Sequence, residues 1–446
     1  MTSQYTGPYD GWRRDKEGLG LWEHQGKVSI QGWGMSQIDR RWDGVSMDKT
    51  LGAYCILAVE RALEDAGLSL EDIDGLFTCP DNLAGVPNGG TAASWGPSRS
   101  YFDPPYDSEE GLTVATQKWI LNNLKPPNIK FAPEYVPAIG EGLGMAAQAV
   151  ADGHCNVALY IYTMNNLEGR YRRGGESASQ YARDGNQWNN PWGANNITLQ
   201  AGGTLPLRQY CHKYGTTWEE MMGPAIVNEH RNGMMQSWGF YVLHGASGLT
   251  YEDYINSRPI AWPARIWDYD RPVHGAAAFI ITSAERAKDM KQKPVYVLNH
   301  NDGRGGDARS SGITMDDWEE GKARVARMVY EGSGLTAADV DIFNPYDGFS
   351  VFLPFALEAF GWHGVKKGEA ADFLKGDISV EGPHPFTSGG GNLGNGRTRT
   401  AMYIDSIEQL RGTAGKRQVN VKAETAVCAY DPSLTAWYLA LANAQP

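Results

Sequence analysis

Residues Gly334–Ser350 read GLTAADVDIFNPYDGFS. The leading glycine predicts the end of a helix, and the apolar run that includes Ile342 and Phe343 predicts a short buried strand. The loop that follows carries Tyr346 and Asp347 side by side, and an apolar segment of helical spacing begins directly after it. Because α/β enzymes present reactive groups on the loops at strand ends, we expect chemistry at this loop.

The beginning of this stretch occurs a second time in the first half of the chain. Residues Gly67–Asn82 read GLSLEDIDGLFTCPDN, and in both copies Gly-Leu-Ser/Thr is followed by Asp-Ile/Val-Asp and an apolar strand. A segment with apolar residues at helical spacing precedes each copy. A repeat whose period is near half the chain indicates two related lobes, whereas solenoid repeats have periods of about 20 to 50 residues.

Length and composition agree with one large two-lobed enzyme. The 446 residues exceed an ordinary single core, and 41% of them are hydrophobic. The formal net charge of −12 argues against nucleic acid or an anionic membrane as the main partner. We find no signal-peptide core and no apolar run of about 20 residues, so we expect a soluble cytoplasmic protein. The five cysteines form no CxxC pair, which favours reduced thiols over disulfides or a zinc site.

Between about residues 165 and 265 the alternation of strands and helices breaks down. A long excursion of this kind in an α/β chain is typical of a cap over a site. Its Trp, Met and Tyr residues suit either a pocket for a bulky apolar ligand or ordinary packing of the cap. The later segment Gly389–Gly394 fits the pattern GxGxxG but follows Pro-Phe-Thr-Ser and no strand, so we do not expect a dinucleotide site.

Four motifs, in their order along the chain, resemble the thiolase superfamily and above all the sterol-carrier-protein-type thiolases. They are PIAWPARIWDYDRPVHGAAAFIITSAERAKD (Pro259–Asp289), DVDIFNPYDGFS (Asp339–Ser350), TSGGGNLGNGRTRT (Thr387–Thr400) and AETAVCAYD (Ala423–Asp431). The resemblance implies an α/β thiolase fold of two duplicated βαβαβαββ lobes in a five-layer α-β-α-β-α arrangement with a large inserted cap. It places the N-terminal lobe at 27–290, with the cap at about 165–265, and the C-terminal lobe at 291–446.

The departures from the thiolase pattern concern the reactive groups. Aligning Gly142 with the glycine of the family's CxxG motif puts Ile139 at the position of the nucleophilic cysteine, and isoleucine cannot form a thioester. Tyr346 stands where the HDxF motif has histidine, and Arg397 or Asn395 falls near the histidine of the GHP motif. Claisen chemistry by the usual thiolase route is therefore not expected.

This altered set resembles the thiolase-fold aldolases of bacterial steroid and bile-acid side-chain breakdown. The resemblance implies retro-aldol cleavage of a β-hydroxyacyl-CoA whose hydroxyl group lies on a steroid ring carbon. The products would be a 17-ketosteroid and a short acyl-CoA such as propionyl-CoA. It also implies a small OB-fold acyl-CoA-binding partner subunit and, by analogy with thiolases, a dimer of this chain, hence a heterotetramer. No cluster of His, Asp and Glu suggests a metal, and we expect no cofactor beyond the coenzyme A that the substrate carries.

The family's two catalytic tyrosines carry over to Tyr346 and to Tyr296, which lies on the strand that opens the C-terminal lobe. A tyrosine suits the proton of an alcohol because its ordinary pKa is about 10. The expected substrate-binding residues are Asp347, His274, Asn395 and Cys428. Structural roles compete with these assignments, because buried strands commonly use tyrosine for packing. In the same way, His274 suits a satisfied core histidine and Asp347 suits a residue that points away from Tyr346 and holds the loop.

Three other functions stay open. A thiolase or acyltransferase would use Cys428 as a non-standard nucleophile. An aldolase acting on an aryl β-hydroxyacyl-CoA would need the same acid–base groups. A non-catalytic scaffold would keep the fold only to bind acyl-CoA or a partner, and it predicts that Tyr346→Phe changes nothing measurable.

Overall fold

The computed structural model describes residues 20–79, 111–112, 115–133, 136, 139–165, 199–304, 314–430 and 435–446. Eight strands in these residues form one mixed sheet in the order β2-β3-β6-β1-β7-β10-β9-β8, and β4 and β5 form a separate hairpin. The strands are β1 Val28–Met35, β2 Gly75–Cys79, β3 Val157–Asn165, β4 Pro259–Ala261, β5 Ala264–Arg265, β6 His274–Ser283, β7 Val295–Arg304, β8 Ile342–Asn344, β9 Thr425–Tyr430 and β10 Thr435–Ala442.

Helices lie on both sides of each half of this sheet. They are α1 Leu51–Ala66, α2 Gln117–Leu124, α3 Glu141–Ala151, α5 Leu199–Tyr214, α6 Trp218–Gly233, α7 Phe240–Leu243, α8 Tyr251–Ile255, α9 Ala284–Ala287, α10 Met315–Ser333, α11 Phe352–Phe360, α12 Ala370–Leu374, α13 Gly391–Asn395 and α14 Ala401–Arg411. Among the residues that the structure describes, no helix is both long and apolar enough to cross a membrane.

The two halves of the sheet repeat one another. The strand order is the same from either end once β2 is matched with β8, β3 with β9, β6 with β10 and β1 with β7. The strand directions agree as well, because the first pair of each half is parallel and the next two pairs are antiparallel. The predicted duplication is therefore confirmed. The predicted lobe boundary between residues 290 and 291 falls in the connection from β6 to β7 and stays a prediction.

The repeated sequence motif forms the same local structure twice. Helices α1 and α10 both end at a left-handed glycine, Gly67 with φ of 71° and Gly334 with φ of 70°. Glycine is favoured there because a side chain makes this backbone conformation costly. Two residues later Ser69 and Thr336 each form a capping box with an aspartate and start a short 3₁₀ turn. These capping signals explain why the repeat is visible in the sequence.

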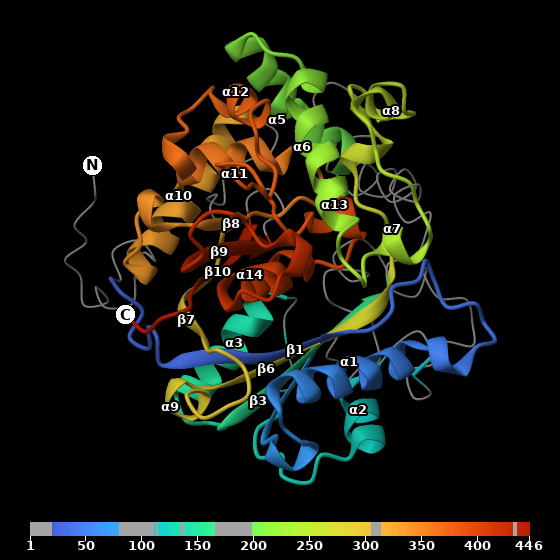
Figure 1. The fold of residues 1–446 in the computed structure, drawn as a ribbon, viewed down its shortest axis with the longest axis vertical. Helices are drawn as coiled ribbons and strands as arrows, with labels where there is room; N and C mark the ends of the chain where they lie inside the picture. Colours follow the sequence, from blue (N-terminus) through green and yellow to red (C-terminus); the bar gives the residue numbers. More distant parts are fainter. Residues whose placement is uncertain are drawn as a thin grey trace, which may run out of the picture.

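Five layers result from the way the two halves of the sheet separate. Strands β1 and β7 pair only between Ser29 and Tyr296 and between Ile30 and Val295. Beyond this short contact the halves diverge, and α3 and α14 lie between them (Figure 1). Helix α1 covers the outer face of the N-terminal half, and α10 covers the outer face of the C-terminal half. The expected α-β-α-β-α arrangement is present.

Strand β3 shows how the layers divide the core. Its residues Val157, Leu159 and Ile161 belong to a buried cluster with α1. The alternate residues Tyr160 and Tyr162 belong to the larger cluster around α3, α14 and the C-terminal half. A strand that is buried on both faces reads as an almost continuous apolar run, which is what the sequence has here. The two tyrosines therefore face the space between the lobes.

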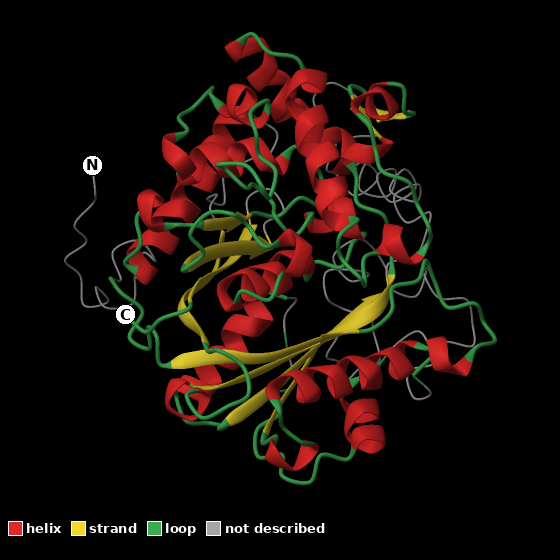
Figure 2. Cartoon of the chain, in the orientation of Figure 1, coloured by secondary structure: helices red, strands yellow, loops and turns green. Residues whose placement is uncertain are grey.

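The inserted cap adds helices at the end of the molecule beyond the C-terminal half of the sheet (Figure 2). Its described part comprises α5, α6, α7, α8 and the hairpin β4–β5, whereas residues 166–198 of the predicted cap lie outside the described residues. Trp218, Met221 and Met222 on α6 are buried in the main core. Packing therefore accounts for these three apolar residues of the cap.

Candidate active site

The loop after β8 is held firmly at both ends. At its start, Asn344 Nδ2 donates to Asp405 Oδ2 and Ser406 Oγ on α14, each at 3.0 Å. At its end, the backbone N–H of Ser350 donates to the carbonyl oxygen of Asp268 at 3.0 Å, and the Ser350 hydroxyl donates to the Asp268 carboxylate. Charge-assisted and buried hydrogen bonds of this kind fix the loop that carries Tyr346.

Tyr346 lies in a tight, buried position on this loop. Its side chain is 4% exposed, and its ring stacks on Phe352 with centroids 5.5 Å apart. A Cβ atom at Gly348 would lie 2.1 Å from the tyrosine hydroxyl oxygen. Only glycine leaves room for the phenol there, so the sequence Tyr-Asp-Gly sets the position of the ring.

Asp347 points away from Tyr346 and binds the beginning of α13. Its two carboxylate oxygens accept hydrogen bonds from the backbone N–H groups of Asn392 at 2.8 Å and Leu393 at 2.7 Å. Complete burial raises the pKa of this carboxyl from 3.8 to about 7, against the lowering effect of the two N–H groups. The contacts agree with the loop-holding role that was weighed for Asp347, and a contact with substrate stays a prediction.

The glycine-rich segment allows close packing of backbone on backbone. A Cβ at Gly391 would lie 2.1 Å from Asp347 Oδ2, and a Cβ at Gly233 would lie 2.1 Å from the carbonyl oxygen of Gly394. Helix α6 of the cap thereby sits directly on α13 and brings the buried Glu229 near Asp347. Burial, and then the Asp347 charge, raise the pKa of Glu229 well above its ordinary value. The segment acts as a packing surface.

Three of the residues considered from the sequence have protein partners of their own. Asn395 Nδ2 donates to the carbonyl oxygens of Gly389 at 2.7 Å and Gly391 at 2.8 Å. His274 Nε2 lies 2.9 Å from the carbonyl oxygen of Lys49, and burial lowers the pKa of this histidine. Arg397 Nε lies 3.6 Å from Asp270 Oδ2 in a buried ion pair. Their roles toward a substrate stay predictions.

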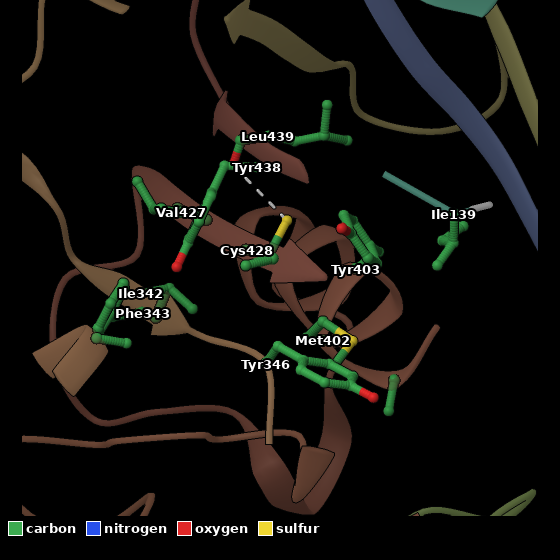
Figure 3. Close-up of a cluster of buried hydrophobic side chains, with 14 of the residues drawn as sticks. Ile139, Ile342, Phe343, Tyr346, Met402, Tyr403, Val427, Cys428, Tyr438 and Leu439 are labelled. Carbon is green, nitrogen blue, oxygen red and sulfur yellow. Dashed lines mark hydrogen bonds between the residues drawn. The ribbon is translucent and has the colours of Figure 1, made fainter. Parts of the chain in front are cut away.

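The thiolase nucleophile positions hold no activated thiol. Ile139 is fully buried just before α3, and it lies in one cluster with Tyr346, Tyr403 and Cys428 (Figure 3). Cys428 lies on β9 with its Sγ 3.8 Å from the carbonyl oxygen of Leu439, and burial raises the pKa of the thiol to about 12. Because the thiolate is the reactive species, this cysteine is a poor nucleophile at neutral pH.

Tyr296 lies on β7 in the middle of the sheet, whereas Tyr346 follows β8, the edge strand. The residues of the C-terminal half pair in register from Asn344 on β8 across β9 and β10 to His300 on β7. Tyr296 precedes His300 by four residues, and Tyr346 follows Asn344 by two in the same strand direction. Four residues of extended strand correspond to roughly 13 Å along β7, and three strand spacings add roughly 14 Å across the sheet. The structure therefore does not bring these two tyrosines together.

The structure brings other polar groups to the space between the lobes. Arg399 Nη1 donates to the hydroxyl oxygen of Tyr162 at 3.1 Å, and both side chains are fully buried. Tyr160 on the same face of β3 interacts electrostatically with Tyr403 of α14. The sequence signal for this group was the pair of alternate tyrosines in an apolar strand, which sequence reasoning did not select. Within the described ranges, no three His, Cys, Asp or Glu side chains gather as a metal site requires.

The known proteins that are similar to this chain agree with one another in fold and in type of activity. The family model described as "Thiolase C-terminal domain-like" matches residues 307–431. A "17-hydroxy-3-oxo-4-pregnene-20-carboxyl-CoA lyase" of Mycobacterium tuberculosis is 30% identical over 396 residues, which cover 83% of this chain and 90% of that protein. A "Steroid side-chain-cleaving aldolase" of Thermomonospora curvata is 28% identical over 80% of this chain and 84% of the relative.

Solved structures share the same fold. A structure described as "Ltp2-ChsH2(DUF35) aldolase" superposes with a TM-score of 0.72 at 22% identity and covers 94% of this chain and 98% of its own. An acetyl-CoA acetyltransferase from Syntrophomonas wolfei superposes with a TM-score of 0.57 at 14% identity, covering 94% and 99%. The five-layer architecture is thus the thiolase fold.

Proposed function

The chain belongs to the steroid side-chain-cleaving aldolases of the thiolase superfamily, and on this premise we propose that it cleaves a 17-hydroxy steroid CoA thioester by a retro-aldol reaction. It is an enzyme, a carbon–carbon lyase. The proposed products are a 17-ketosteroid and propionyl-CoA. The observation that carries this reaction is a buried tyrosine, Tyr346, on a fixed loop beside a nucleophile position filled by Ile139.

The chemistry needs a base, a leaving enolate and an acid. The phenolate of Tyr346 takes the proton of the β-hydroxyl group, the carbon–carbon bond breaks, and its electron pair passes to the thioester enolate. The ring carbon becomes a ketone, and protonation of the enolate α-carbon completes the acyl-CoA. No covalent enzyme intermediate is required, which suits a site without a reactive thiol.

The anchoring of the loop that carries Tyr346 supports the role of Tyr346 as the base. The loop is anchored through Asn344 and Ser350, and the ring packs against Gly348 and Phe352. A group held in one orientation gains more from proximity than a mobile one does. The ordinary pKa of tyrosine, about 10, also matches an alcohol better than that of histidine.

We propose that the active assembly contains two copies of this chain and two copies of a small OB-fold subunit that binds acyl-CoA. The two-component name of the solved aldolase supports a partner of this kind. Coenzyme A enters as part of the substrate, and the reaction as proposed uses no other cofactor. The described part of the cap, residues 199–265, and the lobes predicted at 27–290 and 291–446 would enclose the steroid thioester between them.

The test is incubation of the protein with a 17-hydroxy steroid-22-oyl-CoA, with and without the OB-fold subunit, while the ketone and propionyl-CoA are followed by mass spectrometry. Tyr346→Phe is expected to abolish cleavage. Tyr296→Phe is expected to keep it, since Tyr296 lies three strands away from β8 and four residues before the position in register with Asn344. Turnover of acetoacetyl-CoA and free CoA without steroid cleavage would instead favour a thiolase. Cleavage unaffected by Tyr346→Phe would remove the proposed base.

A further inference from the structure

We infer that a cavity beside the end of β1 binds the ring system of a ketosteroid, and that the indole N–H of Trp238 donates to a carbonyl group of those rings. The choice of a steroid as the ligand rests on the proposed function. The inference adds a binding site on this chain and a residue that recognises the ligand, and both can be tested without any cleavage.

The cavity lies where β1 has lost its neighbour on one side. Within the described residues, β1 pairs with β7 only at Ser29 and Ile30, so the end of β1 carries no further strand on that side. A cavity of about 610 Å³ lies between this end of β1, helix α1 and the turn from α6 to α7. Sites for small molecules have volumes of roughly 300 to 1,000 Å³. The cavity is therefore suited in size to a ligand such as a steroid.

The charged side chains at the cavity sum to zero. Those that the structure describes in its lining are Arg61, Glu64, Asp65 and Lys291. Arg61 donates to the carbonyl oxygen of Met35, and Lys291 Nζ donates to that of Glu64 at 2.6 Å. A diphosphate is bound by cations and N–H groups that are directed at it. The cavity therefore suits an uncharged ligand better than the nucleotide of coenzyme A.

The inner wall of the cavity combines apolar surface with a buried donor. Met35 is 1% exposed and Trp238 is 7% exposed, and Trp33 adds a second indole to the lining. Nε1 of Trp238 is buried and has no hydrogen-bond partner among the residues that the structure describes. Because a buried donor without a partner is unfavourable, a ligand that supplies an acceptor explains this one. Apolar walls and an N–H donor match a bulky apolar ligand with a carbonyl oxygen.

The wall that carries Trp238 contacts the helix that holds the loop after β8. The residue after Trp238 is Gly239, where a Cβ would lie 2.7 Å from Asn395 Oδ1 on α13. On the same helix, the backbone N–H of Asn392 donates to Asp347 at 2.8 Å. Helix α13 has five residues and is only roughly 7 Å long. The cavity wall and the loop with the proposed base therefore contact one short helix.

The sequence left a pocket and ordinary packing as alternatives for the aromatic residues of the cap. Trp238 belongs to this segment, and it differs from Trp218, whose Nε1 donates to Asp268 at 3.2 Å. The indole N–H of Trp218 is thus satisfied within the protein, whereas that of Trp238 lies unsatisfied at a cavity. For Trp238 these observations favour the pocket.

The test is equilibrium dialysis of the full-length chain with androst-4-ene-3,17-dione and with two analogues that each lack one of its carbonyl groups. The wild type is expected to bind the diketone saturably and one analogue about 3- to 10-fold more weakly, which corresponds to the loss of one hydrogen bond. In Trp238→Phe this preference should disappear, because an aromatic ring remains but its donor is gone. A role of Trp238 in packing alone would change the affinity for all three ligands by the same factor.

Trp33→Phe is the matched control. It makes the same substitution in the same cavity and should leave the preference for the carbonyl group unchanged. Ser237→Trp tests the location, because it places a large side chain in the cavity from an exposed position and should abolish binding of the diketone.

Four results would overturn the inference: no binding of the diketone to the wild type, a carbonyl preference that survives in Trp238→Phe, unchanged binding in Ser237→Trp, or displacement of the diketone by free coenzyme A. The last result would assign the cavity to the nucleotide. Binding that depends on Trp238 in a protein that cleaves no steroid thioester would overturn the proposed function and leave the binding site in place.

Discussion

Replacement of Asp347 by asparagine tests the electrostatics beneath the Tyr346 loop. The carboxyl group is fully buried, accepts the N–H groups of Asn392 and Leu393, and titrates near pH 7 in the folded protein. In the unfolded chain its pKa returns to about 3.8. Because the folded pKa is raised, the neutral form favours folding at low pH, and this contribution is lost as pH rises through 7.

The magnitude follows from proton uptake on folding. Between the unfolded and the folded pKa, each pH unit changes the free energy of unfolding by about 1.4 kcal/mol. From about pH 5.5 up to its pKa of about 7, the carboxyl is protonated in the folded protein and ionised in the unfolded chain, over about 1.5 pH units. From there to about pH 8.5 it is ionised in both states. Wild-type stability therefore falls by about 2 kcal/mol through this group. Asparagine does not titrate, and the Asp347→Asn variant lacks this fall.

The assay is urea denaturation of both proteins at the two ends of that pH range. The difference in free energy of unfolding, wild type minus Asp347→Asn, should decrease by about 2 kcal/mol from the low to the high pH. Asp268 and Glu408, whose pKa values are also raised, titrate in both proteins and cancel in the difference. Glu229 does not cancel fully, because its pKa depends on the Asp347 charge. A difference that stays constant across the range would refute the assignment of a raised pKa to Asp347.

Three further substitutions test the packing and the chemistry. Gly233→Ala should destabilise the protein by about 3 kcal/mol or more in urea denaturation, because the new Cβ would meet the Gly394 carbonyl oxygen at 2.1 Å; a neutral effect would contradict this contact. Cys428→Ala should keep the cleavage rate within about twofold, since a thiol with a pKa of about 12 is not the nucleophile; an inactive variant would return the protein to thiolase chemistry. Arg231→Ala breaks an exposed ion pair with Glu381 and should cost less than about 1 kcal/mol, so a larger loss would show that the pair is more than a surface contact.

The duplicated architecture was visible in the sequence because its signals are local. A left-handed glycine followed by a capping box ends the first helix of each lobe, at Gly67 and at Gly334, and such signals depend on a few neighbouring residues. The loop of Tyr346 and Asp347 was also recognisable, since it follows a short apolar strand directly. Local patterns of this kind survive without knowledge of the partners that they contact.

The grouping of the candidate site residues was decided only by tertiary structure. Tyr296 and Tyr346 both belong to the C-terminal half, yet the order and the register of its strands separate them. Tyr162 and Arg399 are 237 residues apart and meet only because the two halves pack face to face around α3 and α14. A contact across two lobes depends on the register and the packing of several strands together. No local sequence pattern encodes this combined arrangement.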